Sequence, residues 1–181
     1  FLMIGTFDAL WAVVLDDLNT SDWIANLGIT LFALPLVLLA STGGRLSQRV
    51  GPYRVATVGL LLAAVYMALY GVVPSGGIMF AIAMVHAVTD GLSITSTAVA
   101  VGMVVAPARQ AGAQGVMTGF QTLTAGITAP IAGAIYQYVG RGAAYGLTAL
   151  TMVGLVALGV WLARSAWSLT EEEISEDVAR L

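Results

Sequence analysis

The sequence predicts an all-α fold, a polytopic membrane bundle of six transmembrane helices, and three observations support this prediction. Hydrophobic residues make up 59% of the 181 residues and charged residues only 9%, which leaves too little polar surface to cover a water-soluble globule. Six apolar segments reach or approach the roughly 20 residues that cross a bilayer. The arginines gather in alternate connections between those segments, as expected when charged loops stay on the untranslocated side.

The six predicted spans lie within residues 1–165, which form the transmembrane bundle. Their approximate ranges are residues 1–15, 23–40, 55–73, 78–105, 115–138 and 143–163. The chain begins at Phe1, inside an apolar run and without an initiator methionine, so we expect a fragment of a longer protein.

Each predicted span ends at a recognisable turn. The first span is short and ends at an acidic turn, residues 16–22, and the second ends at a glycine- and arginine-rich stretch, residues 41–54. Proline and glycine end the third span at residues 74–77, and proline and arginine end the fourth at residues 106–112. Glycines flank Arg141 after the fifth span, and the sixth closes on Arg164.

Charge predicts the orientation of the bundle. Loops 41–54 and 106–112 and the C-terminal tail carry Arg45, Arg49, Arg54, Arg109 and Arg164, whereas the opposite loops carry Arg141 together with Asp16, Asp17 and Asp22. Because moving a guanidinium through hydrocarbon is costly, we expect the first group of loops and the tail to be cytoplasmic. The lipid bilayer, most simply that of the plasma membrane, is then the immediate partner of the chain.

Residues 166–181 form an acidic tail that we expect to be cytoplasmic. Thr170 and Glu173 have capping-box spacing, and Ile174, Val178 and Leu181 recur on one helical face. This pattern predicts a short amphipathic helix. A frayed, solubilising tail fits the same residues.

The arginine-rich loop carries a motif that resembles a known family. Gly44, Leu46, Ser47, Arg49, Gly51 and Arg54 have the residue types and spacing of the loop motif of the major facilitator superfamily (MFS). Residues 112–140 look like the penultimate helix of that family, with Gly119, Gly126, Pro130 and Gly133 as kink and packing positions. The resemblance implies a secondary active transporter that works by alternating access, and it gives the loop a role in gating. A simple topology anchor explains the arginines equally well.

The resemblance also implies that half of the transporter is missing. Gln48 stands where the family motif has an acidic residue, a departure common in the second copy of the motif, so we interpret the chain as the C-terminal six-helix half. The other six-helix half would be its partner. A first-half identity is the second interpretation.

Ionisable residues within the spans are the best indication of mechanism, since each costs about 2.5 to 3.5 kcal/mol at a span centre. Asp8 lies in the first span, and His86 and Asp90 lie at i, i+4 in the fourth. All three approach the midplane, where transporters bind cargo. We expect them to carry or relay a proton coupled to the movement of a small organic solute. A hydrogen-bonded structural pair, with Asp8 facing water, fits the same positions.

Other functions follow less well from the sequence. A six-span homodimeric carrier or channel would need no second half. An intramembrane enzyme lacks its motifs: Gly91-Leu92-Ser93-Ile94 has no glycine after the serine, and one histidine with no cysteine cannot build a usual catalytic zinc site. We therefore expect no catalytic residues, metal or cofactor, and no basic stripe for nucleic acid. The acidic residues favour proton-driven export, although uptake of a sugar or metabolite fits nearly as well.

Overall fold

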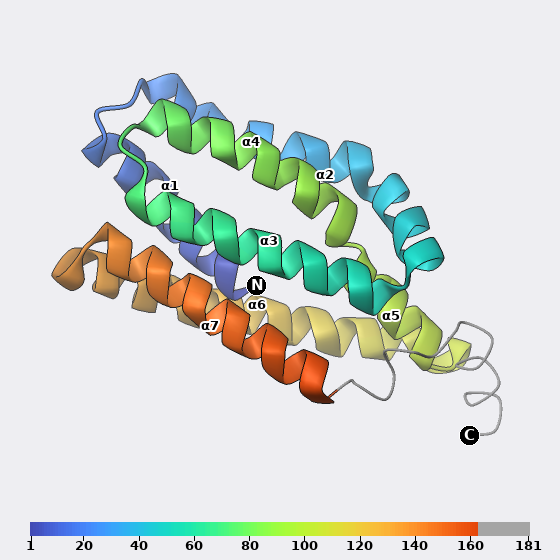
Figure 1. The fold of residues 1–181 in the computed structure, drawn as a ribbon. Helices are drawn as coiled ribbons and strands as arrows, with labels where there is room; N and C mark the ends of the chain where they lie inside the picture. The colour runs from blue at the N-terminus through green and yellow to red at the C-terminus, as the bar shows by residue number, and fades with distance from the viewer. Residues whose placement is uncertain (163–181) are drawn as a thin grey trace.

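Helices account for nearly all of the computed structural model, which describes residues 1–162 (Figure 1). The elements in order are α1 (Leu2–Asp17), α2 (Asp22–Val50), α3 (Pro52–Val72), α4 (Gly76–Ser93), α5 (Ser96–Val104), the 3₁₀ turn η1 (Pro107–Arg109), α6 (Gln110–Val139) and α7 (Arg141–Leu162). The connections α1–α2, α3–α4 and α6–α7 lie at one end of the bundle, and α2–α3 and α5–α6 lie at the other (Figure 1). The predicted tail, residues 166–181, lies outside the described residues.

The helices confirm the predicted all-α membrane bundle. Within residues 1–162, α2, α3, α4 together with α5, and α7 are long and apolar enough to cross a membrane. With α4 and α5 counted as one interrupted span, the elements form six units that correspond to the six predicted spans. At 16 residues, α1 is shorter than the roughly 20 residues of a full span.

The predicted loop at residues 41–54 is mostly helical, which corrects the sequence interpretation. The α2 helix continues to Val50 and α3 begins at Pro52, so Gly51 alone makes the turn, with φ +102°. Glycine tolerates this left-handed conformation because it has no Cβ, and proline suits the first turn of the next helix. Gly43 does not break α2, because it is buried where the helix passes close to the backbone of Gly91 and Leu92.

The predicted fourth span corresponds to one apolar span, Gly76–Val104, with a short irregularity between α4 and α5. The α4 helix ends at Ser93 and α5 begins at Ser96. Hydroxyl side chains near the break bond to the backbone: Ser93 Oγ donates to the Thr89 carbonyl and Thr97 Oγ1 donates to the Ile94 carbonyl. Such local bonds compete with the regular helical ladder, and they leave the apolar pattern of the span unchanged.

Three helix pairs build the bundle: α3 packs along α7, α2 along α4, and α1 along α6 (Figure 1). Close approach occurs where a glycine faces the backbone of its neighbour, as Gly5 faces Ala125 and Gly91 faces Pro35. The interior is aromatic. Its largest fully buried side chains include Trp11, Tyr70, Tyr145, Met67 and Met79.

Arg141 occupies the end of the bundle opposite the other described arginines, and its contacts explain this position. Its Nη2 donates to the Val73 carbonyl at 2.7 Å and its Nε to the Gly71 carbonyl at 3.3 Å. These carbonyls belong to the C-terminal end of α3, where the helix dipole favours a cation. The guanidinium therefore caps α3 from the first residue of α7.

Candidate functional site

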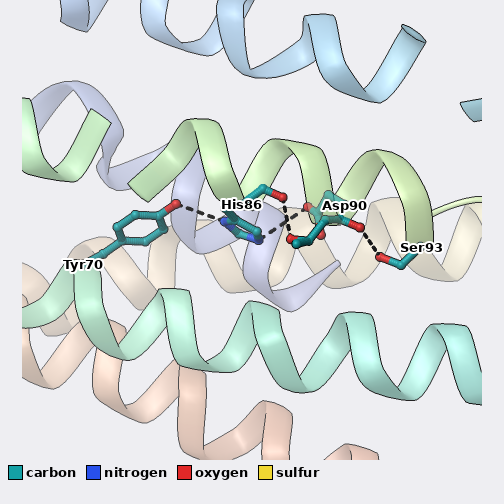
Figure 2. Close-up of polar contacts among 5 residues, drawn as sticks. Tyr70, His86, Asp90 and Ser93 are labelled. Carbon is teal, nitrogen blue, oxygen red and sulfur yellow. Dashed lines mark hydrogen bonds and ion pairs between the residues drawn. The ribbon is translucent and has the colours of Figure 1, made fainter. Parts of the chain in front are cut away.

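A chain of polar side chains lies between α3 and α4 (Figure 2). The Tyr70 hydroxyl and His86 Nδ1 are 3.0 Å apart, and His86 Nε2 is 3.5 Å from Asp90 Oδ2. Nε2 forms no hydrogen bond within the described residues, and we assign the ring proton to it because it faces the Asp90 carboxylate, so that Nδ1 accepts from the Tyr70 O–H. The Nε2 to Oδ2 distance is within ion-pair reach but longer than a normal N–H···O bond of about 2.7–3.2 Å.

Aromatic rings enclose the imidazole of His86. Tyr66 lies with its ring centroid 4.7 Å from that of His86, and Phe32 approaches edge-on at 5.4 Å. The residue is 0% exposed, whereas Asp90 is 7% exposed and lines a cavity of about 210 Å³. Only the carboxyl end of this polar chain therefore faces a cavity, and His86 is shielded behind it.

The predicted site residues do not all come together. His86 and Asp90 are paired as their i, i+4 spacing predicts. Asp8 lies on the exposed side of α1, while the neighbours Thr6 and Phe7 are buried. Its carboxylate forms no ion pair or hydrogen bond with the His86–Asp90 pair. A role for Asp8 in coupling stays a prediction.

The predicted gating motif separates into one buried residue and an exposed set. Ser47 is 0% exposed, and its hydroxyl hydrogen-bonds that of Ser96, the first residue of α5. The motif thus touches the α4–α5 break directly. Leu46, Arg49 and Arg54 are exposed, and the guanidinium groups have no acidic partner among residues 1–162. Gly44 faces open space and Gly51 makes the turn. Gating by this motif stays a prediction.

The predicted packing positions on α6 lie on an open face. A Cβ added at Gly119, Gly126 or Gly133 would meet no atom within 4 Å in the described part of the chain. The helix continues through Pro130 without a break in its assignment. The close contact between α1 and α6 uses Ala125 instead, against Gly5. A role for these glycines in helix packing stays a prediction.

Sequence reasoning missed Tyr70. It lies near the C-terminal end of α3, where the sequence alone suggests an aromatic anchor at the membrane interface, because most neighbours are apolar. A signal was present in the i, i+4 pair Tyr66 and Tyr70, since two tyrosines on one face of a membrane span call for polar partners. The span carrying those partners, His86 on α4, could not be identified without the tertiary arrangement.

Replacing Tyr70 with phenylalanine should remove the hydrogen bond that orients the imidazole of His86. We expect the unfolding free energy in detergent to fall by about 0.5–1.5 kcal/mol, because one buried hydrogen bond is lost. We also expect ¹⁵N NMR of His86 to show a mixture of tautomers in place of the Nε2–H form. Tyr66→Phe is the matched control, because the Tyr66 ring stacks on His86 with no hydroxyl bond to it. Identical spectra for the two variants would contradict the assigned role of Tyr70.

The family model described as Major Facilitator Superfamily matches residues 1–176. A Salmonella typhimurium (strain LT2) protein described as an uncharacterized MFS-type transporter is 29% identical over 141 residues, which cover 77% of this chain and 35% of the relative. The chain thus matches about a third of the length of that curated relative. No solved structure matches the present chain.

Proposed function

The chain belongs to the major facilitator superfamily, and from this premise we propose that it is one six-helix half of a proton-coupled secondary transporter for a small organic solute. The family favours a transporter over an enzyme. In this proposal the bundle rocks against a second six-helix bundle around a midplane site, so that the site opens to each side in turn. Proton-driven export is the direction that the acidic residues favour.

The observation that carries the proposal is the buried carboxyl of Asp90 facing a cavity. Ionisable groups inside a membrane span are expensive, and they mark ion and proton pathways. Asp90 is paired with His86, and His86 is hydrogen-bonded to Tyr70, so two buried polar side chains support this one carboxyl. Alternate loading and release of a proton at this carboxyl would couple the proton gradient to the rocking of the bundle.

We further propose that the α2–α3 and α5–α6 connections, within residues 41–54 and 106–112, and the C-terminal tail are cytoplasmic, at the plasma membrane. Arg45, Arg49, Arg54 and Arg109 lie at the end of the bundle that holds the α2–α3 and α5–α6 connections. Arginine-rich loops remain on the cytoplasmic side. The exception at the opposite end, Arg141, is held by the carbonyls of α3, so its position reflects helix capping.

Proton flux tests the function directly. The complete transporter, reconstituted in liposomes with a pH-sensitive dye inside, should move protons when a transported solute is added, and an imposed pH gradient should drive solute accumulation. Liposomes treated with a protonophore are the control. Solute movement that neither responds to the gradient nor moves protons would overturn the proposed coupling.

A further inference from the structure

An apolar groove with a volume of about 290 Å³ lies on the surface of the bundle, between α2, α3 and α4. It begins at Arg54, in the first turn of α3, and continues past Val58 to Leu62 on the same helix. Eight residues of helix cover about 12 Å, which is close to the roughly 15 Å of hydrocarbon in one leaflet of a bilayer. The groove therefore extends along α3 through most of one leaflet.

The walls of this groove offer almost no polar groups. Leu46 contributes from α2 and Leu92 from α4. The two hydroxyl groups in the lining belong to Thr89 and Ser93, and both donate to backbone carbonyls of α4. The floor is closed where Gly59 brings α3 against the Ser93 side chain. Such a surface suits a hydrocarbon chain and offers no hydrogen bond to a polar ligand.

The helix that carries the groove faces hydrocarbon. After Arg54, every exposed residue of α3 is apolar, namely Val58, Leu60, Leu61, Leu62, Val65, Ala68, Leu69 and Val72. The exposed sides of α1 and α6 differ, since they carry Asp8 and Thr124. Lipid tails are as apolar as leucine, so bilayer lipid is the molecule that meets this side of the bundle.

Arginines surround the end of the groove that reaches the membrane surface. Arg54 lines the groove itself, and Arg45 and Arg49 line a neighbouring hollow that shares Leu46 with it. The three guanidinium groups form no ion pair with an acidic side chain among residues 1–162. Arg45 donates its Nε–H to the Ser41 carbonyl and keeps its other donors. Because a guanidinium matches the geometry of a phosphate, this end of the groove favours an anionic phosphate group.

We propose that the groove binds one membrane phospholipid with an anionic headgroup, with its phosphate on Arg54 and one acyl chain along Val58 and Leu62. Arg45 and Arg49 add positive charge beside the headgroup. The cytoplasmic leaflet carries the negative lipid charge, and this end of the bundle is the one proposed above to be cytoplasmic. The lipid would hold α2, α3 and α4 together at the α2–α3 turn. This proposal depends on the membrane bundle and not on proton coupling.

Lipid binding by the complete transporter tests the headgroup contact. We would titrate the purified protein in detergent with dioleoylphosphatidylglycerol, and with dioleoylphosphatidylcholine, which has the same chains but no net charge, and measure bound lipid by native mass spectrometry. Phosphatidylglycerol should bind more tightly. Arg54→Gln should weaken its binding about fivefold, the factor that one arginine near a membrane surface contributes. Arg109→Gln, which removes an exposed arginine outside the groove, is the matched control and should leave binding unchanged.

A second pair of variants tests the acyl-chain contact. Val58 is exposed in the groove, so the indole of Val58→Trp should occupy the groove and weaken the binding of phosphatidylglycerol. Val65→Trp places the same side chain on exposed α3 outside the groove and should have no effect. Unchanged binding in Arg54→Gln or Val58→Trp, equal losses in a variant and its control, or equal affinity for the two lipids would overturn the site. Displacement of the lipid by an equal concentration of glycerol 3-phosphate would also overturn it, because the interaction would then lie in the phosphate alone.

Discussion

Asp90→Asn should abolish proton-driven transport by the complete protein, reducing solute accumulation to the level measured without a pH gradient. Asparagine preserves the size and polarity of the side chain but cannot bind and release a proton. Asp90 is the carboxyl that lines the cavity and pairs with His86, so we expect no other group to replace it. Accumulation in reconstituted liposomes under an imposed gradient measures the effect.

The control for this prediction is Asp22→Asn, which removes a carboxyl at the exposed start of α2. Its accumulation should equal that of the unaltered protein. Solute exchange across liposomes without a gradient should persist in Asp90→Asn at a measurable rate, because the bundle can still rock. Full gradient-driven accumulation by Asp90→Asn would remove this carboxyl from the coupling mechanism.

Gly43→Val should strongly destabilise the fold. A Cβ at Gly43 would lie 2.5 Å from the Leu92 carbonyl oxygen and 2.8 Å from that of Gly91. Both atoms are backbone atoms of α4, so no side-chain rotation relieves the clash, and α2 and α4 must separate. Overpacking of this kind typically costs about 1–3 kcal/mol, and we expect the upper end of that range as a lowered unfolding temperature in detergent.

Gly44→Val provides the matched control on the neighbouring residue. A Cβ at Gly44 meets nothing within 4 Å in the described part of the chain, so we expect a change in unfolding free energy of about 0.5 kcal/mol or less. Equal destabilisation by the two substitutions would mean that helix propensity, and not the contact between α2 and α4, decides stability here.

The sequence was sufficient to predict the membrane bundle because length and hydropathy determine spans directly. The turns were harder to predict. The pattern around Gly43 and Gly44 reads as a loop, but a helix continues through it, since glycine is also used where two membrane helices touch. The irregularity after Ser93 cannot be read from hydropathy, because it involves hydroxyl groups bonding to local carbonyls within an otherwise apolar span.

The candidate site was predicted in part. The pairing of His86 with Asp90 follows from helical spacing alone, and the structure confirms it. The separation of Asp8 could not be predicted, because depth in the membrane does not determine which side of a helix faces the core. The role of Tyr70 could not be predicted for a similar reason. Its hydrogen bond to His86 joins two helices, and the rotation of each helix about its axis decides whether the two side chains meet.

The most direct test of the proposed half-transporter is the intact mass of the native gene product, measured by mass spectrometry on protein purified from its own membrane. The present chain has a mass of 18.7 kDa. We expect a product of about twice this mass or more, because a second six-helix bundle is needed for alternating access around a midplane site. A native product of the same mass as this chain would contradict the proposal and would favour a six-span protein that pairs with its own copy.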